Sequence, residues 1–281
     1  MKIVKTIKEI REIVLQQQKK GRTIGLVPTM GYLHKGHLSL VEAARRNNDF
    51  IVMSIFVNPT QFGQNEDYDK YPRDLERDAR LAEDAGVDVI FSPEVKEMYP
   101  EGYKTYVNVE GITEILCGKS RPGHFRGVTT IVCKLFNIVK PDRAYFGQKD
   151  AQQAAVIKKM VSDLNLDLEI VTCPIVREED GLAMSSRNVY LDEQQRKSAL
   201  ILSKALFEAQ RQVLEGERNK QKIRDNILKM LHTEKTAEVD YVEIVNADTL
   251  EEIEEIKGKV LIALAVRFGT TRLIDNVIVE V

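Results

Sequence analysis

The chain of 281 residues is poor in cysteine, has no excess of either charge and contains no long apolar run. Its three cysteines, Cys117, Cys133 and Cys173, are far apart and lack the Cys-x-x-Cys spacing of a metal or redox site. This odd, scattered set argues against a disulfide framework and favours a reducing cytoplasm. The apolar run at residues 50–57 is far shorter than a membrane span, so we expect a cytoplasmic protein that is neither exported nor embedded in a membrane.

The balance of charge excludes a further class of partner. Lysine and arginine total 41 and aspartate and glutamate total 43, which leaves a net charge of −2. Such a chain has no overall field that would attract nucleic acid or an anionic membrane. A phosphate-bearing ligand must therefore be held by a local site.

Short apolar runs rich in valine and isoleucine alternate with helical patterns in the first part of the chain. We predict parallel strands over residues 23–27, 50–57, 87–91, 144–146 and 168–175. A first helix is expected before the sheet, with Thr6 and Glu9 as its capping box, and an apolar stripe closed by Pro141 predicts a helix over residues 128–139. The alternation predicts an α/β fold with a doubly wound, Rossmann-like parallel sheet, whose ligands bind beyond the carboxyl ends of the strands.

The pattern changes after about residue 176. A long helix is expected to begin near Asp192, a lysine-rich helix extends to His232, and alternating strands follow at residues 239–245 and 260–268. We therefore predict two domains. Residues 1–176 form the Rossmann-like domain, and residues 177–281 form a smaller α+β C-terminal domain that acts as a lid.

The loop after the first predicted strand, residues 28–37, contains two of the four histidines. A helical pattern begins directly after it, so His34 and His37 bracket a helix N-terminus. Free backbone amides and the helix dipole favour an anion there, and imidazoles can donate hydrogen bonds to phosphoryl oxygens. Gly31 and Gly36 would let phosphate approach the backbone. The segment predicts a phosphate site, with a capped turn and solvated histidines as the alternative.

Two further loops have side chains that suit a carboxylic acid. Gln61 follows the second predicted strand beside Phe62 and can bind hydroxyl or carboxylate oxygens, although an ordinary turn is the alternative. Residues 118–127 combine four lysine, arginine or histidine side chains with three glycines. This second loop can clamp a carboxylate or pyrophosphate, or it can be a solvated loop.

Two more segments suit a nucleotide. Residues 146–153 lie at the next strand-to-helix junction, where Lys149 can contact phosphate and Asp150 can accept from a ribose hydroxyl or merely cap the helix. Residues 177–188 span the domain boundary, and their hydroxyls and guanidinium groups suit a lid that closes on a triphosphate. An inert linker is the alternative for this last segment.

These motifs together resemble a known family. The His34-x-Gly36-His37 segment resembles the His-x-Gly-His signature of the nucleotidyltransferase superfamily. The wider run at residues 27–31 and the ordered motifs up to residue 188 are similar to the pantothenate synthetase family. Ala183 stands where the tRNA synthetases of this superfamily have the first lysine of Lys-Met-Ser-Lys-Ser, and this departure points to the same family.

The resemblance implies a role for each site residue. ATP contacts are implied for Met30, Gly31, His34, His37, Gly147, Gln148, Lys149, Asp150, Val176, Met184, Ser185, Ser186 and Arg187. Contacts with pantoate or β-alanine are implied for Gln61, Gln153, Arg121 and His124. Catalytic stabilisation of phosphate charge is implied for His34, His37, Lys149, Ser185, Ser186 and Arg187. Asp78 is a weaker candidate for contact with a magnesium ion bound to ATP.

The implied reaction is the ATP-dependent condensation of pantoate with β-alanine through a pantoyl adenylate, with release of pyrophosphate and AMP. A homodimer is implied by the same resemblance. Two other interpretations stay open: a nucleotidyltransferase that moves AMP onto a phosphate, and a catalytically silent nucleotide sensor. The first would need a basic acceptor pocket where this chain has Gln61 and Gln153.

Overall fold

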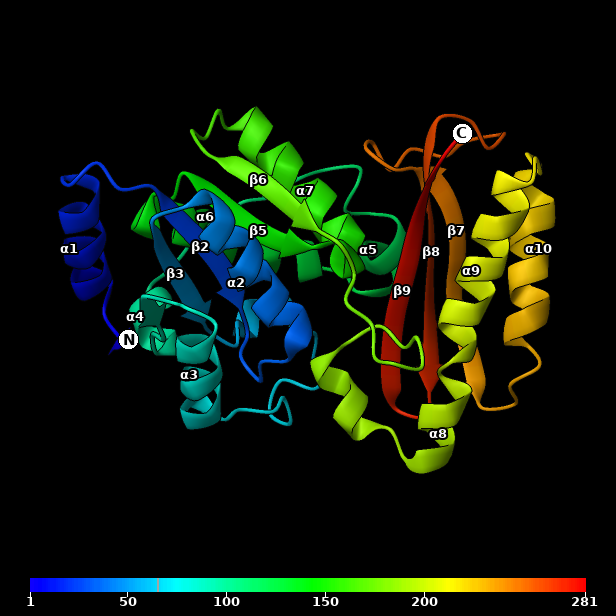
Figure 1. Ribbon diagram of the computed structural model, residues 1–281, viewed down its shortest axis with the longest axis horizontal. Helices are drawn as coiled ribbons and strands as arrows, with labels where there is room; N and C mark the ends of the chain where they lie inside the picture. Colours follow the sequence, from blue (N-terminus) through cyan, green and yellow to red (C-terminus); the bar gives the residue numbers. More distant parts are fainter. Residues whose placement is uncertain (65) are drawn as a thin grey trace.

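The computed structural model describes residues 1–64 and 66–281 and shows two packed units side by side (Figure 1). The first is a six-stranded parallel sheet with helices on both faces. The second is a three-stranded antiparallel sheet covered by α9 (Ile201–Leu214) and α10 (Lys220–Leu231). The predicted α/β class, with a smaller α+β domain after the parallel sheet, is confirmed.

The order of the parallel strands places the site. The sheet consists of β1 (Lys2–Val4), β2 (Ile24–Thr29), β3 (Phe50–Ile55), β4 (Val89–Phe91), β5 (Arg143–Gly147) and β6 (Glu169–Cys173). Their order is β1-β4-β3-β2-β5-β6, so the chain winds outward from β2 in one direction and then adds β5 and β6 on the other side. A crevice opens at the carboxyl ends of the two strands where such a reversal occurs. The loops after β2 and β5 therefore face each other.

Helices bury both faces of this sheet. They are α1 (Ile7–Gln18), α2 (Lys35–Asn47), α3 (Leu75–Asp84), α6 (His124–Val139) and α7 (Ala151–Asp163), with the short helices α4 (Val95–Met98) and α5 (Leu116–Ser120). Val52 packs in the cluster with α1, α6 and α7, whereas Ile51 and Met53 pack with α2 and α3. Because successive strand side chains point to opposite faces, burial on both faces requires the continuous apolar runs seen in the sequence.

The C-terminal sheet is also covered on both faces. It consists of β7 (Ala237–Asn246), β8 (Lys259–Phe268) and β9 (Thr271–Glu280), in that order. Ile262 and Leu264 pack with α9 and α10 on one face, while Leu261 and Ala263 pack on the other face against Ile115 and against α7. The second unit is thus joined to the first through an apolar contact beside α5.

Several local predictions are confirmed and two are wrong. The Thr6 capping box is present, and the predicted helix at residues 128–139 lies within α6. The first helix does not precede the sheet as expected, because β1 comes before α1 and pairs with β4. Neither β1 nor β9 was predicted, and in β1 Val4 is the one buried residue, so three residues are too few for a pattern. The long helix expected from Asp192 is two helices, α8 (Glu193–Ser198) and α9, since the backbone N–H of Leu200 bonds to the carbonyl of Lys197 and tightens the turn. The boundary between residues 176 and 177 stays a prediction.

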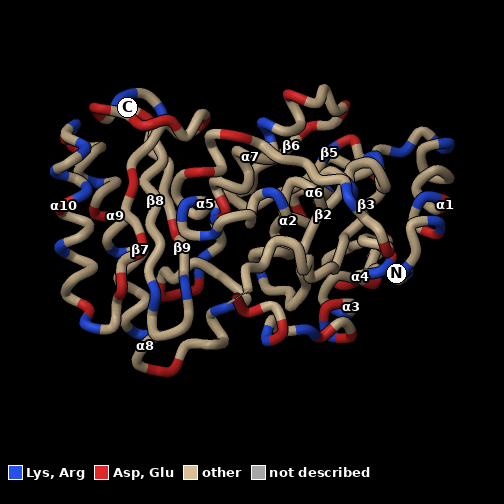
Figure 2. The backbone as a smooth tube through the Cα atoms, turned by 180° about the vertical axis from the view of Figure 1, so that it is seen from behind, with Lys and Arg blue, Asp and Glu red and all other residues tan. Residues whose placement is uncertain are grey.

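The distribution of charged residues along the chain agrees with the balanced composition. Lysine and arginine are interspersed with aspartate and glutamate along both units (Figure 2). Cys117, Cys133 and Cys173 are free thiols. None of the helices formed by the described residues is long and apolar enough to cross a bilayer.

Candidate active site

A cavity lies at the carboxyl ends of β2 and β5, and we call it the central cavity. Most of the predicted site residues line it: Met30, His34, His37, Gln61, Arg121, His124, Gly147, Lys149, Asp150, Gln153, Val176, Met184, Ser185, Ser186 and Arg187. Gly31, Asp78 and Gln148 are predicted site residues that do not. The sheet thus brings together side chains that are more than 150 positions apart in the sequence, and their individual roles stay predictions.

Reciprocal hydrogen bonds fix the two histidines at the start of α2. Nδ1 of His34 accepts from the backbone N–H of Gly36 at 3.1 Å, and Nδ1 of His37 accepts from the backbone N–H of His34 at 3.2 Å. The imidazoles therefore form a capping box, a role more often filled by serine and glutamate. A Cβ at position 36 would lie 2.9 Å from the His34 ring. The His-x-Gly-His spacing follows from this cap, which places the two rings 4.0 Å apart.

Both imidazoles are neutral near pH 7. Burial, assisted by the charge of Lys149, lowers the pKa of His34 to about 4. Burial and the neighbouring His34 lower the pKa of His37 well below its usual value. Because Nδ1 accepts a hydrogen bond in each ring, the single proton of each neutral ring resides on Nε2. The two residues can therefore each offer an N–H donor to the central cavity.

Asp78 lies behind the loop that follows β2 and not in the central cavity. Its carboxylate accepts from the backbone N–H groups of Tyr32 and Leu33, both at 2.7 Å, and its side chain is 1% exposed. Gly31 and Tyr32 both have positive φ, at 83° and 50°, so the carboxylate holds a turn that ordinary residues rarely adopt. This position does not support the expected magnesium contact, because both oxygens are already used to hold the loop.

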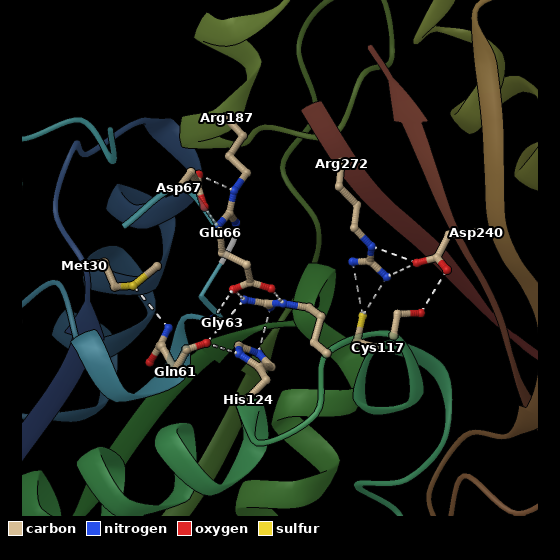
Figure 3. A network of polar contacts seen from close by, with 12 residues as sticks. Met30, Gln61, Gly63, Glu66, Asp67, Cys117, His124, Arg187, Asp240 and Arg272 are labelled. Atoms are coloured by element: carbon tan, nitrogen blue, oxygen red, sulfur yellow. Dashed lines mark hydrogen bonds and ion pairs between the residues drawn. The ribbon is translucent and has the colours of Figure 1, made fainter. Parts of the chain in front are cut away.

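Three of the four acid-binding candidates, Gln61, Arg121 and His124, form one hydrogen-bonded group in the part of the cavity next to β3, while Gln153 lines the cavity outside this group. Nδ1 of His124 lies 2.8 Å from the main-chain oxygen of Gln61, and Nε2 lies 3.0 Å from the guanidinium of Arg121. Asn58 orients the side chain of Gln61 by donating to its Oε1 at 3.1 Å. The sulfur of Met30 lies 3.1 Å from Nε2 of Gln61 (Figure 3). Burial and the charge of Arg121 lower the pKa of His124 to about 4, so this imidazole is also neutral.

An apolar wall lies beside this polar group, and it was not predicted from the sequence. It consists of Pro28, Phe56, Val128, Ile131, Val132, Leu135 and Phe146. From the sequence, the stripe on α6 predicts a helix and nothing about the cavity. A single stripe can serve both purposes, because Val128, Ile131, Val132 and Leu135 line the cavity while the same helix also contacts α1.

Lys149 and Asp150 reach the cavity from the 3₁₀ turn η2 (Gln148–Asp150), while Gln148 is directed elsewhere. The side chain of Asn276, on β9, donates to the main-chain oxygens of Gln148 and Lys149, both at 3.0 Å. The side chain of Gln148 donates to Asn276 Oδ1 at 3.2 Å. The side chain of Gln148 thus contacts the C-terminal sheet, and its ATP contact stays a prediction.

The segment after β6 covers the other side of the cavity. Ser185 caps η3 (Ser186–Tyr190) by accepting from the backbone N–H of Arg187 at 3.3 Å, and the Ser186 hydroxyl contacts the main-chain oxygen of Tyr32 at 3.3 Å. Arg187 forms two hydrogen bonds of 2.9 Å with Asp67. Arg121 forms a similar pair with Glu66, at 2.5 and 2.6 Å (Figure 3). Neither acid was predicted from the motifs, because both lie between them.

Comparison with known proteins now decides the family. A family model described as Pantoate-beta-alanine ligase matches residues 2–278. The chain belongs to the pantoate-β-alanine ligase family. The pantothenate synthetases of Acetivibrio thermocellus and Caldicellulosiruptor saccharolyticus are 72% and 63% identical to this ligase over 281 residues, and each match covers 100% of both proteins.

Solved structures agree with this membership. A pantothenate synthetase from Thermus thermophilus matches this ligase with a TM-score of 0.94 at 48% identity, over 99% of each chain. A pantoate-β-alanine ligase from Francisella tularensis, solved in complex with β-γ ATP and β-alanine, matches with a TM-score of 0.80 at 36% identity, over 99% of this chain and 97% of that chain. The family predicted from the motifs is confirmed.

Proposed function

We propose that this ligase joins pantoate to β-alanine through a pantoyl adenylate. A carboxylate oxygen of pantoate attacks the α-phosphorus of ATP, and pyrophosphate leaves. The amine of β-alanine then attacks the acyl carbon, AMP leaves, and the amine loses a proton to give the amide. The observation that carries this proposal is that one cavity is lined by the neutral imidazoles of His34 and His37, by Lys149 and by Gln61.

The phosphate side of the cavity suits adenylation. Negative charge increases on the α-phosphoryl oxygens as the new bond forms, and fixed donors aimed at that charge lower the barrier. Nε2 of His34 and of His37 would supply such donors, Lys149 would add a positive charge, and Ser185, Ser186 and Arg187 would contact the leaving pyrophosphate. Nothing in this scheme requires a nucleophilic side chain, since the substrate's own carboxylate is the nucleophile.

The other side of the cavity suits a small branched hydroxy acid. The amides of Gln61 and Gln153 can bind carboxylate and hydroxyl oxygens, while the wall formed by Phe56 and α6 can accommodate the two methyl groups of pantoate. Arg121 and His124 lie close to Gln61, and Arg121 would bind the carboxylate of β-alanine by exchanging it for its present partner, Glu66. A phosphate acceptor would find a largely apolar wall here, which disfavours AMP transfer onto a phosphate.

We further propose that magnesium enters with ATP. Among the described residues no group of three or more histidine, cysteine, aspartate or glutamate side chains could hold a metal ion. Magnesium commonly keeps several water ligands and binds through phosphate oxygens with one or two carboxylates, and Asp150 is a carboxylate that lines the cavity. When bound, the ion would neutralise charge on the triphosphate.

One isotope experiment tests the adenylate. The protein is incubated with ATP, β-alanine and pantoate labelled with ¹⁸O in its carboxylate. We expect pantothenate, AMP and pyrophosphate in equal amounts, with one labelled oxygen transferred to AMP. Unlabelled AMP would exclude the adenylate, and AMP transfer to an added phosphate ester without amide formation would favour the rival nucleotidyltransferase. ATP binding without turnover would favour the sensor.

The quaternary structure is a separate proposal. The resemblance to the family implies a homodimer in the cytoplasm, with ATP, pantoate and β-alanine as its ligands. Light scattering coupled to size-exclusion chromatography should give twice the mass of 32.0 kDa. A monomeric mass over the whole concentration range would contradict the dimer without affecting the proposed chemistry.

A further inference from the structure

A polar cluster joins the C-terminal sheet to helix α5, outside the central cavity. The hydroxyl of Ser120 donates to Oδ1 of Asp240 at 2.8 Å, and Nε of Arg272 donates to Oδ2 at 2.8 Å. Both guanidinium NH groups of Arg272 also lie 3.7 Å from the sulfur of Cys117 (Figure 3). The cluster thus links α5 in the first unit with β7 and β9 in the second.

Asp240 is aimed at α5 by an irregularity in its strand. The register of β7 against β8 runs through Val239 and resumes at Tyr241, so Asp240 is the extra residue of a bulge. An extra residue bends a strand and re-aims a side chain, and such bulges recur beside functional sites. The side chains of Asp240 and Arg272 are 21% and 14% exposed, so their ion pair is largely withdrawn from water.

Helix α5 is also held by Gln152, a residue of α7. The side chain of Gln152 is buried; its Oε1 accepts from the backbone N–H of Cys117 at 2.9 Å, and its Nε2 donates to the carbonyls of Ile112 and Ile115. A Cβ at Gly118 would lie 1.8 Å from the carbonyl oxygen of Thr113, so the helix sits directly against the preceding loop. Gln152 thus holds the start of the helix, whereas its last residue, Ser120, is held by Asp240.

Arg121 directly follows Ser120 and connects helix α5 to the central cavity. Arg121 lies 3.0 Å from Nε2 of His124, and His124 contacts the main chain of Gln61. A displacement of Ser120 would therefore be transmitted to the group that faces the carboxylic acids. Ser120 itself is exposed, so its hydroxyl has no role in folding the core.

We propose that Asp240 is a positioning residue of the ligase reaction, which holds α5 through Ser120 so that Arg121 and His124 meet the carboxylate substrates. This proposal rests on the proposed function for the identity of those substrates. It assigns to the C-terminal unit a task beyond covering the triphosphate: it sets the geometry of the acid-binding group in the first unit.

The test compares Ser120→Ala and Asp240→Ala, each of which removes the hydrogen bond between the two residues, with Asp248→Ala, a matched change in the same sheet unit. Asp248 forms an exposed ion pair with Lys259 at 3.2 Å and takes no part in the cluster. Loss of one hydrogen bond should raise the KM for at least one carboxylate substrate by about 3- to 10-fold. The KM for ATP should stay within about 2-fold, the scale of a near-neutral surface change. The control should change none of these values.

A second readout does not depend on turnover. The pKa of His124, measured by NMR on the full chain, should rise from about 4 in both variants, because a released α5 exposes the imidazole to water and moves Arg121 away. Unchanged carboxylate KM values together with an unchanged His124 pKa would overturn the positioning role. If the parent protein made no pantothenate, the proposed function would fail, and the His124 titration would still decide the role of Asp240. Ser120→Ala keeps the Asp240–Arg272 pair, so it covers the case in which Asp240→Ala fails to fold.

Discussion

Arg187 and Asp67 face each other through two hydrogen bonds of 2.9 Å, on the side of the central cavity where the triphosphate is proposed to bind. The guanidinium therefore already has a carboxylate partner before ATP arrives. Paired geometry of this kind is the arrangement in which arginine also binds phosphate. If Arg187 binds the triphosphate as proposed, Asp67 competes with a phosphate oxygen for its guanidinium group.

The first prediction concerns this competition. Asp67→Asn should lower the KM for ATP by about 3- to 10-fold, because a partly buried ion pair worth about 1 kcal/mol no longer competes with the nucleotide. Steady-state kinetics at saturating acid and amine measures it. Asp69→Asn, an exposed aspartate two residues away, is the control. An unchanged or higher KM for ATP would show that Asp67 supports Arg187 and does not compete for it.

The second prediction tests the histidine donors. His37→Ala should lower the rate of adenylate formation by about 100-fold or more, the scale for removing one transition-state donor. Pyrophosphate release in a single turnover, with β-alanine omitted, isolates this step. His232→Ala, at the exposed end of α10, should leave the rate unchanged. A rate near that of the parent protein would remove His37 from the mechanism.

The third prediction follows from the spacing of the motif. Gly36→Ala would place a Cβ 2.9 Å from the His34 ring, and the ring must move because the helix start cannot. We expect kcat to fall by about 10-fold or more, since the displaced imidazole loses its aim at the phosphate. Gly63→Ala serves as the control, because its Cβ would meet only the Glu66 side chain at 3.6 Å. Equal activity of the two variants would contradict the capping explanation.

The fourth prediction concerns pH and stability. The pKa values of His34 and His124 are about 4 in the folded state, below the ordinary value of 6.5, so the unfolded chain binds protons that the folded chain rejects. Stability is therefore unaffected above pH 6.5 and falls as the pH decreases from 6.5 to about 4. Urea unfolding at several pH values measures the slope, and His124→Asn should reduce it by about 1.4 kcal/mol per pH unit. The same slope in parent and variant would mean that His124 is protonated in the folded protein.

Much of the fold could be predicted because its signals are local. Buried parallel strands need continuous apolar runs, and a capped amphipathic helix such as α6 shows its period in the sequence. The failures have a physical cause as well. β1 is too short to show a pattern, and in β9 a run of three buried residues interrupts the alternation that marks a strand.

The site could be predicted where a motif sits at a strand end, and could not where its partners come from elsewhere. His34, Lys149 and Ser185 follow strands, and the switch point brings them together. The Asp78 carboxylate accepts a hydrogen bond from the backbone N–H of Tyr32. A side chain predicted to contact magnesium therefore stabilises a turn of the chain. Asp240 reaches α5 from more than 100 residues away, through a bulge that leaves no signal in composition or period.

The apolar wall on α6 has a consequence for the lifetime of the intermediate. An acyl adenylate is a mixed anhydride, which water cleaves back to the acid and AMP with the loss of one ATP. Val128, Ile131 and Leu135 offer no hydrogen bond with which to orient an attacking water molecule beside the acyl group. The helix that fills the core of the first unit would therefore also limit wasteful hydrolysis, so that ATP consumption stays coupled to amide formation.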